Sequence, residues 1–220
     1  MIIAIVGAES TGKTVLSQAL ADRLAAETGL RCTAVPEWLR LWCEREQRVP
    51  SQDEQRAIAQ EAWTRIDTAQ RANEVVVADT TPLMVAVYSL LLFDDDAVVP
   101  FAIDCQRHCA ATLLTAVDLT WVADGLFRDG PQVQRPVDEI TRRLLGEHGL
   151  AYSVVGGVGA TRLERAIDAV TPVFARTATP RGGLFTRLQQ RDVAQPTWIC
   201  TKCDAPDCEH ALLRRRRGGA

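Results

Sequence analysis

The sequence predicts an α/β fold in which a doubly wound, parallel, five-stranded sheet is covered by helices on both faces. The 220 residues are 47% hydrophobic and 24% charged, as in an ordinary globular protein. Short apolar runs alternate with segments of helical periodicity along the chain. The first of these runs ends in a glycine-containing turn that leads directly into a helix. Strands that alternate with helices favour right-handed βαβ units, and such units build a parallel sheet.

The predicted strands are short runs, and two of them, residues 1–6 and 75–78, are apolar throughout, as expected for strands buried on both faces. The five predicted strands are residues 1–6, 31–36, 75–78, 116–122 and 152–155. The segments with helical periodicity lie between and after them. They are residues 14–27, 37–46, 53–72, 83–93, 101–112, 137–147 and 162–174. Gly29 ends the first helix, Ser51 supplies a start for the third, and Pro82 precedes the fourth. Residues 124–136 contain two glycines and two prolines and are predicted to form a loop.

The turn after the first predicted strand carries a phosphate-binding motif. It fits G-x-x-x-x-G-K-[ST] and lies between a strand and a helix, as that motif requires. Its residues are Gly7, Ala8, Glu9, Ser10, Thr11, Gly12, Lys13 and Thr14. The glycines let backbone N–H groups point at phosphate oxygens, and the helix N-terminus adds its dipole. We predict that Lys13 reaches the β- and γ-phosphates of ATP and that the Thr14 hydroxyl ligates Mg²⁺.

Three acids follow the predicted strands, at the edge of the sheet where ligands collect in doubly wound folds. Asp79 follows an apolar strand and is predicted to face Mg²⁺ or its waters, although it could instead cap the next helix. Glu37 is either a base for a substrate hydroxyl or an acid that stabilises a helix start. Trp38 can stack on a flat ring, and Arg40 lies one helical turn away on the same face as Glu37. Asp124 is the third acid, beyond the fourth strand.

The predicted loop after the fourth strand holds two arginines, Arg128 and Arg135. Kinases that exclude water close such a loop over the phosphates, and its arginines balance charge in the transition state of phosphoryl transfer. The alternative interpretation is a solvated surface loop with no role in catalysis.

These motifs together resemble the nicotinamide riboside kinase domain of the bacterial NAD-biosynthesis regulator and related P-loop (AAA-like) ATPases. The resemblance covers about residues 1–175. Beside the phosphate loop it rests on Glu37-Trp38-x-Arg40, Ala78-Asp79-Thr80-Thr81 and Trp121-Val122-x-Asp124-Gly125-Leu126, with Arg135 beyond. It implies a P-loop NTPase fold of nucleoside-kinase type. It also implies ATP-dependent phosphorylation of the ribose 5′-hydroxyl of nicotinamide riboside to give the mononucleotide.

The resemblance also implies roles for individual residues. Lys13 and Thr14 would serve ATP and Mg²⁺, Glu37 would be the base, Asp79 the acid beside the metal, and Arg128 and Arg135 the lid arginines. The acceptor would contact Glu37, Trp38, Arg40 and Asp124. The alternatives are a kinase of another nucleoside or small metabolite, and a nucleotide-dependent regulator that binds nucleic acid.

A second motif lies near the C-terminus, where Cys200, Cys203, Cys208 and His210 fall within eleven residues. Three thiolates and one imidazole suit a closed tetrahedral Zn²⁺ site, which is a structural type of site because no position is left for substrate. We therefore predict a structural zinc knuckle. A redox Cys-x-x-Cys pair and a tail with incidental cysteines are the alternatives.

Charge limits the partners of this chain. Residues 198–220 hold five basic and three acidic residues, and the rest of the chain holds 20 basic and 25 acidic ones. The mildly acidic body cannot bind nucleic acid through bulk charge, so only the basic tail could do so. We interpret residues 214–217 as a solvated basic terminus rather than a nucleic-acid contact.

The predicted organisation is a P-loop kinase domain at residues 1–175, a linker or docked extension at 176–197, a zinc knuckle at 198–213 and a basic tail at 214–220. No apolar run approaches the roughly 20 residues of a membrane helix, and no secretory signal is recognisable at the N-terminus. We therefore expect a cytoplasmic location and a small-molecule nucleoside as the partner. The sequence predicts no oligomeric state.

Overall fold

A computed structural model of the chain describes residues 1–122 and 130–177. The chain divides into two compact units, Met1–Thr179 and Pro180–Ala220, and every described residue lies in the first. The four predicted zinc ligands and the basic tail lie outside the described residues, as do Asp124 and Arg128.

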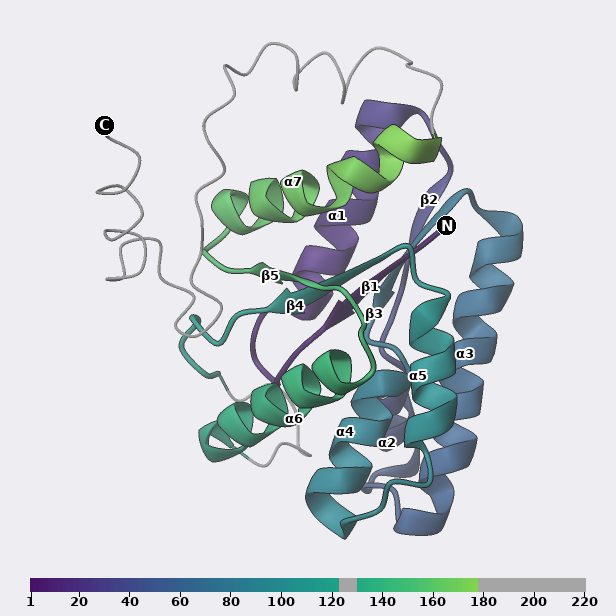
Figure 1. The fold of residues 1–220 in the computed structure, drawn as a ribbon, viewed down its shortest axis with the longest axis vertical. Helices are drawn as coiled ribbons and strands as arrows, with labels where there is room; N and C mark the ends of the chain where they lie inside the picture. Colours follow the sequence, from purple (N-terminus) through teal and green to yellow (C-terminus); the bar gives the residue numbers. More distant parts are fainter. Residues whose placement is uncertain (123–129, 178–220) are drawn as a thin grey trace. The chain divides into compact units, whose positions relative to one another are not determined.

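Five parallel strands form one sheet at the centre of the described unit (Figure 1). They are β1 (Ile2–Val6), β2 (Cys32–Val35), β3 (Val75–Asp79), β4 (Ala111–Thr115) and β5 (Ser153–Val155). Their order across the sheet is β2-β3-β1-β4-β5, and every pairing is parallel. All residues of β1 and β3 are buried, which requires cover on both faces because side chains alternate along a strand. The predicted doubly wound, five-stranded parallel sheet is thus confirmed.

Seven α-helices cover the sheet in the described residues. They are α1 (Lys13–Thr28), α2 (Trp38–Glu46), α3 (Gln55–Ala72), α4 (Pro82–Phe93), α5 (Val99–Arg107), α6 (Gln134–Glu147) and α7 (Ala160–Thr177). Helices α1 and α7 contact each other, and α4 contacts α3, α5 and α6 (Figure 1). Short 3-10 turns at Gln52–Glu54 and Pro131–Val133 precede α3 and α6. Among the described residues, no helix combines the length and apolar character that a membrane crossing needs.

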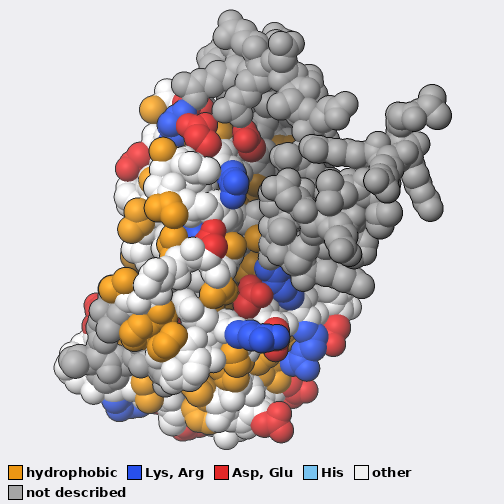
Figure 2. Space-filling model, turned by 90° about the vertical axis from the view of Figure 1, so that its left-hand side faces the viewer, with side chains coloured by type: hydrophobic (Ala, Val, Ile, Leu, Met, Phe, Trp, Pro, Cys, Tyr) orange, Lys and Arg blue, Asp and Glu red, His pale blue; other side chains and the backbone are white. Residues whose placement is uncertain are grey.

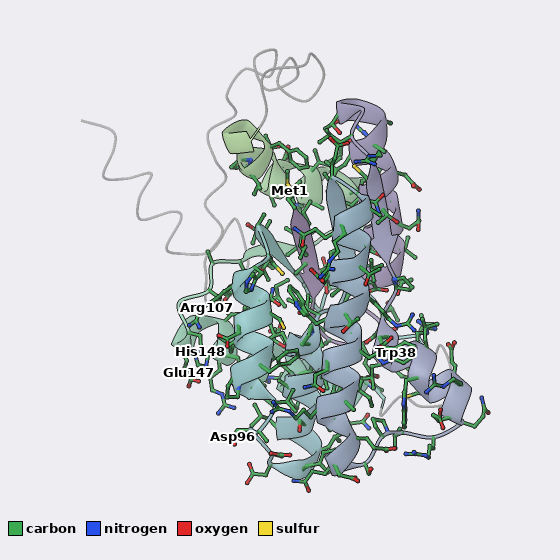
Figure 3. The ribbon with its side chains drawn as sticks, turned by 90° about the vertical axis from the view of Figure 1, so that its right-hand side faces the viewer. Met1, Trp38, Asp96, Arg107, Glu147 and His148 are labelled. Atoms are coloured by element: carbon green, nitrogen blue, oxygen red, sulfur yellow. The ribbon has the colours of Figure 1, made fainter. Side chains whose placement is uncertain are left out.

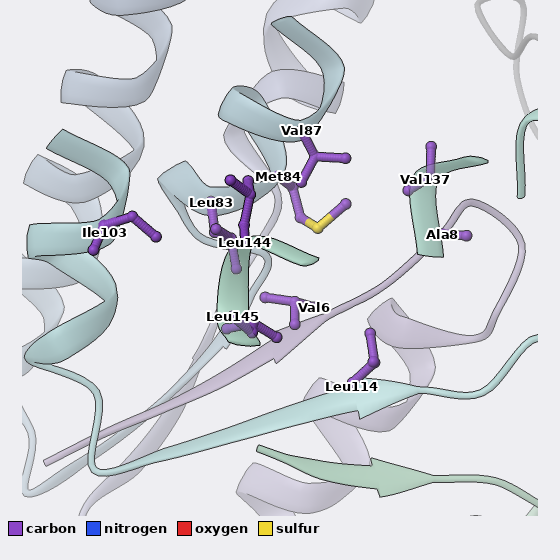
Figure 4. Packing of buried hydrophobic residues seen from close by; sticks show 10 residues of the cluster. All are labelled: Val6, Ala8, Leu83, Met84, Val87, Ile103, Leu114, Val137, Leu144 and Leu145. Carbon is purple, nitrogen blue, oxygen red and sulfur yellow. The ribbon is translucent and has the colours of Figure 1, made fainter. Parts of the chain in front are cut away.

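A buried apolar cluster fixes the start of the phosphate loop (Figure 4). It joins Val6 at the end of β1 and Ala8 in the loop to side chains of β4, α4, α5 and α6. The other members are Leu83, Met84, Val87, Ile103, Leu114, Val137, Leu144 and Leu145. Val6 and Ala8 are both fully buried on either side of Gly7. The backbone of this turn is therefore held by the core.

The prediction for the fourth strand was wrong. The strand is Ala111–Thr115 rather than residues 116–122, and the helix before it ends at Arg107 rather than at residue 112. No glycine or proline separates helix from strand here, so one apolar stretch was interpreted as a single longer helix. The hydrogen bond from Ala110 N to Ile2 O (2.8 Å) brings this strand beside β1. As a result Asp118, rather than Asp124, is the acid that closely follows the strand.

The predicted loop at residues 124–136 is helical at its end. Residues 131–133 form a 3-10 turn, and α6 begins at Gln134, so Arg135 lies in the first turn of a helix. Proline at position 136 suits the first turn, where its missing N–H removes no helical hydrogen bond. Arg135 is exposed and pairs with Glu139 at 2.9 Å.

Charges on the surface are mixed. Figure 2 shows basic and acidic side chains interspersed with hydrophobic ones on the face that it presents. Several ion pairs join residues one helical turn apart, such as Arg65 with Glu61 at 2.9 Å and Arg71 with Asp67 at 2.5 Å. Such local pairing keeps the field over a surface small.

Candidate functional site

The turn between β1 and α1 has the backbone of an anion-binding loop. Gly7, Ser10 and Gly12 have φ values of +140°, +57° and +76°. A Cβ atom on Gly7 would lie 2.3 Å from Thr115 Oγ1, so no other residue fits there. Thr11 donates a hydrogen bond to Ala8 O and shares another with Thr115 Oγ1, both of 2.7 Å. Thr11 therefore closes the loop through a hydrogen bond to the loop's own backbone and fixes it to the last residue of β4.

Helix α1 presents an open N-terminus at the end of this loop. Its N-cap is Gly12, and among the described residues no side chain caps it. Its first turn contains no acidic residue, so the N–H groups and the positive end of the helix dipole are available to an anion. The buried Lys13 folds back over the loop, where its Nζ donates to Ala8 O at 2.7 Å. A phosphate could take the place of that carbonyl as the acceptor.

The two residues predicted to serve Mg²⁺ lie in direct contact. Thr14 Oγ1 donates a hydrogen bond of 2.6 Å to Asp79 Oδ2, which joins the first turn of α1 to the last residue of β3. Asp79 is almost fully buried. One hydroxyl and one carboxylate are hard oxygen donors of the kind that Mg²⁺ takes, with phosphate oxygens and waters completing its six positions. These residues therefore fit the ion.

The tip of the phosphate loop is held by residues on either side of positions 123–129. Ser10 Oγ both donates to Val122 O and accepts from Val122 N, at 2.9 Å each. Gln134 Nε2, at the start of α6, donates to Glu9 O at 2.7 Å. Because Gln134 is buried, its amide fixes this carbonyl firmly. The predicted lid segment thus connects to the loop at both of its described ends.

A buried arginine that the sequence did not single out also contacts the loop. Arg162, in the first turn of α7, donates from Nη1 to Thr11 O at 2.6 Å and from Nε to Gly157 O at 2.7 Å. Its Nη2 forms an ion pair with Asp118, which also accepts from Gly157 N. The signal available in the sequence is the run of glycines at positions 156, 157 and 159 before this helix.

The predicted base lies on the wall of a pocket that is partly open to solvent. The pocket is formed at the carboxyl ends of β2 and β3 with apolar side chains of α3 and α4. Its lining consists of Val35, Pro36, Glu37, Trp38, Leu39, Ala62, Ile66, Thr80, Thr81, Met84 and Val85. Glu37 is the N-cap of α2, but its side chain does not cap that helix. Its place at the N-terminus of α2 is also where the helix dipole stabilises an acid, so both sequence-based interpretations of Glu37 stay open.

Trp38 is fixed by two guanidinium groups. It lies at the start of α2 beside α3 (Figure 3). The guanidinium carbon of Arg65 is 3.8 Å from the centre of its ring system, and that of Arg45 is 5.4 Å away. These cation–π contacts hold the indole against α3, where it also lines the pocket. Arg40 pairs along α2 with Glu44 at 3.3 Å.

The predicted site residues therefore form two groups. Lys13, Thr14 and Asp79 lie together at the phosphate loop, and Glu37 and Trp38 share the pocket one strand away. Arg135 projects from α6 toward Glu139. Within residues 1–122 and 130–177 there is no cluster of three or more His, Cys, Asp or Glu side chains that could hold a metal.

Known proteins share this architecture. The profile of a family described as an AAA domain matches residues 2–162. The structure is similar to that of the NadR protein in complex with NR, with a TM-score of 0.64 and 22% identity over 83% of this chain and 53% of that one. It is also similar to NadR in complex with NAD and AMP-PNP (TM-score 0.59, 20% identity, 82% and 51%). A thymidylate kinase from Ehrlichia chaffeensis has a TM-score of 0.53 and 16% identity over 79% of this chain and 98% of its own.

The chain spans about half the length of the NadR structures that it matches. No curated protein matches the sequence. At these identities the likeness establishes the fold, which is the α/β fold of P-loop kinases. The family profile covers most of the described unit, including the phosphate loop, Asp79 and the network around Arg162. The chain therefore belongs to the AAA domain family, in agreement with the resemblance of its motifs to P-loop (AAA-like) ATPases.

Proposed function

We propose that this chain is an ATP- and Mg²⁺-dependent kinase that phosphorylates the ribose 5′-hydroxyl of a nucleoside, with nicotinamide riboside as the first candidate acceptor. The observation that carries the proposal is the contact between Thr14 and Asp79, one strand away from a pocket with Glu37 on its wall. We infer that the phosphate-binding loop, a magnesium position at Thr14 and Asp79 and a base at Glu37 lie along one edge of the sheet.

The ATP half of the proposal is supported by the geometry of the loop. Its left-handed residues, the open N-terminus of α1 and Lys13 together make a site for a polyphosphate. NadR, which has a similar fold, was solved with the ATP analogue AMP-PNP.

The acceptor half is supported by the pocket and by the same relatives. The lining residues bring apolar side chains and the indole of Trp38, which can pack on a flat ring, beside the carboxylate of Glu37, which can accept from a hydroxyl. NadR was also solved with NR. The motifs around Glu37 and Asp79 in the sequence resemble those of the nicotinamide riboside kinase family. A neutral nucleoside or another small alcohol is the alternative acceptor.

The proposed reaction needs positioning and charge stabilisation more than covalent chemistry. Glu37 accepts the proton of the acceptor hydroxyl while that oxygen forms a bond to the γ-phosphorus of ATP. The bond from this phosphorus to the β-γ bridging oxygen breaks, and ADP leaves. Lys13 and the N–H groups of the loop stabilise the negative charge of the transferring group. Mg²⁺ bound at Thr14 and Asp79 would neutralise charge on the β- and γ-phosphate oxygens.

The proposal is tested by incubating the full chain with ATP, Mg²⁺ and a panel of nucleosides, followed by detection of a new monophosphate. We expect nicotinamide riboside to give the highest kcat/KM. Glu37→Gln should lower kcat by about 10²–10⁴-fold because it removes the base. Glu147→Gln, the same change on an exposed residue at the end of α6, should leave kcat unchanged.

Two results would count against this function. A wild-type chain that phosphorylates no member of the panel would exclude a nucleoside acceptor. Slow ATP hydrolysis without any acceptor, together with salt-dependent binding of nucleic acid that disappears on deletion of residues 198–220, would instead favour a nucleotide-dependent regulator.

The zinc knuckle remains a proposal that rests on the spacing of Cys200, Cys203, Cys208 and His210. We expect about one zinc ion per chain by elemental analysis, as a closed four-ligand site holds. Cys203→Ser should remove it, whereas Cys109→Ser should not. Burial raises the pKa of the Cys109 thiol to about 12, so this cysteine is protonated at neutral pH and is a poor metal ligand. Zinc-free protein from zinc-supplemented cells would refute the knuckle.

A further inference from the structure

Thr80 has a backbone conformation that its residue type disfavours. It follows Asp79 directly, and its φ of +68° lies in the left-handed region. Glycine, asparagine and aspartate enter this region most easily, whereas a β-branched residue there is an outlier. Such outliers persist only where the surrounding structure imposes them, and they concentrate at functional sites.

Both neighbours of Thr80 are fixed. Its own N–H donates to Ile5 O at 3.0 Å, which continues the pairing of β3 with β1. The buried Thr81 is the N-cap of α4, and its hydroxyl donates to Gln106 Oε1 at 2.6 Å. Gln106 in turn donates to Thr112 of β4 at 2.8 Å. This buried chain of hydrogen bonds forces the turn between strand and helix to occur at Thr80.

The side chain of Thr80 lies on the wall of the pocket, together with Glu37 and Trp38. It is half-buried, and among the described residues the hydrogen bond given for Thr80 is that of its backbone N–H to Ile5 O, with none to its hydroxyl. A hydrogen bond of the hydroxyl within the described fold therefore does not explain why threonine occupies a position that suits glycine. A threonine that has a strained backbone and lines the pocket beside Glu37, with a hydroxyl that no described residue binds, is best explained by a molecule bound in that pocket.

We propose that Thr80 contacts the phosphoryl acceptor and contributes to its selection. Its hydroxyl hydrogen-bonds a polar group of the acceptor near the reacting hydroxyl, because Thr80 stands between the magnesium-side Asp79 and the pocket that contains Glu37. The acceptor class is thus one with a second polar group close to the hydroxyl that is phosphorylated, as in a ribose. This inference rests on the proposed function and assigns a further residue to its acceptor site.

The test compares Thr80→Val, Thr80→Ser and Thr80→Gly with the wild-type chain, with separate KM values for acceptor and ATP. The valine variant keeps the shape and loses the hydroxyl, so the acceptor KM should rise about tenfold, the worth of one hydrogen bond. The KM for ATP should not change, and the serine variant should be close to wild type. Thr64→Val on the exposed face of α3 is the matched control and should have no effect.

The glycine variant separates binding from strain. Relief of the positive φ should leave Tm unchanged or raise it by about 2–4 °C, while the acceptor KM rises as in the valine variant. A wild-type acceptor KM in both variants would overturn the role of Thr80 even if the chain is an active nucleoside kinase. A wild-type chain that phosphorylates no nucleoside would instead show that the proposed function has failed, and the role of Thr80 with it.

Discussion

Arg162 donates a hydrogen bond of 2.6 Å from its Nη1 to the carbonyl oxygen of Thr11 in the phosphate loop. The two residues are 151 positions apart, and Arg162 is only 4% exposed. Its other donors contact Gly157 and Asp118, so one side chain ties together the turns that follow β1, β4 and β5. This arrangement turns the Thr11 carbonyl toward the arginine.

Replacing Arg162 should therefore disturb the phosphate loop. We expect Arg162→Gln to raise the KM for ATP about tenfold or more and to lower the free energy of unfolding by about 1–3 kcal/mol. Arg162→Lys should rescue little, because an ammonium group cannot reach three acceptors in a planar arrangement. Steady-state kinetics and urea unfolding measure the two effects. An unchanged KM for ATP in a folded Arg162→Gln variant would contradict the link to the loop.

The sequence predicts the part of this site that is local in the chain. The phosphate loop and the position of Asp79 follow from a strand, a turn and a helix that are contiguous, so their patterns are sufficient. The contact between Thr14 and Asp79 depends on the pairing of β1 with β3, and the sequence pattern does not give this neighbour relationship.

The remainder depends on tertiary structure. No glycine or proline marks the end of α5. The start of β4 is therefore defined by its pairing with β1 and not by a local sequence pattern. That shift makes Asp118 the partner of Arg162, a pair that no local pattern indicates. The positive φ of Thr80 likewise arises from buried hydrogen bonds to α5 and β4, not from the preference of threonine.

Gly7 should tolerate no side chain. In Gly7→Ala the new Cβ would meet Thr115 Oγ1 at 2.3 Å, and the Thr115 backbone is also within 3.1–3.3 Å. Gly29→Ala is the matched control, because Gly29 also has a positive φ but has open space around it. The control should lose about 1 kcal/mol of stability and keep its activity. Gly7→Ala should lose more than this and should no longer bind ATP.

A second variant identifies the cause of that loss. Removing the Thr115 hydroxyl in Gly7→Ala/Thr115→Ala takes away the closest contact but leaves the backbone contacts, so stability should recover only in part. Thermal unfolding and fluorescent-nucleotide binding give the two readouts. A Gly7→Ala chain that is as stable and active as the Gly29→Ala control would show that the turn is not packed as described.

The hydroxyl of Thr14 should govern the magnesium requirement. Thr14→Val removes the oxygen that contacts Asp79, so the Mg²⁺ concentration for half-maximal activity should rise about 10–100-fold, as for loss of a ligand group. Thr14→Ser keeps the oxygen and should restore the wild-type value. Thr28→Val removes another hydroxyl from the same helix and should not change the value. An identical Mg²⁺ dependence in Thr14→Val and wild type would exclude this role.

The start of α3, the helix that supports Trp38, should lose stability in acid. Glu54 accepts hydrogen bonds from Arg48 at 2.6 and 2.7 Å and from Ser51 N at 2.9 Å. Arg48 above all, with Ser51, lowers the pKa of this carboxyl from 4.5 to about 2. As the pH falls, Glu54 is therefore protonated in the unfolded chain before it is protonated in the folded one. Its contribution to the free energy of unfolding is complete above pH 4.5 and is lost as the pH falls toward 2.

Removing the guanidinium group of Arg48 tests whether it lowers the pKa of Glu54. Arg48→Met should move the pKa of Glu54 back toward 4.5, so that part of the acid-induced fall in the free energy of unfolding disappears between these pH values. The effect should be modest and should shrink in high salt, because both side chains are near solvent. Arg71→Met removes another surface ion pair and serves as the control. Urea unfolding at a series of pH values, with a carboxyl titration of Glu54 by NMR, provides the measurement. An unshifted titration in Arg48→Met would show that Arg48 is not what keeps Glu54 ionised.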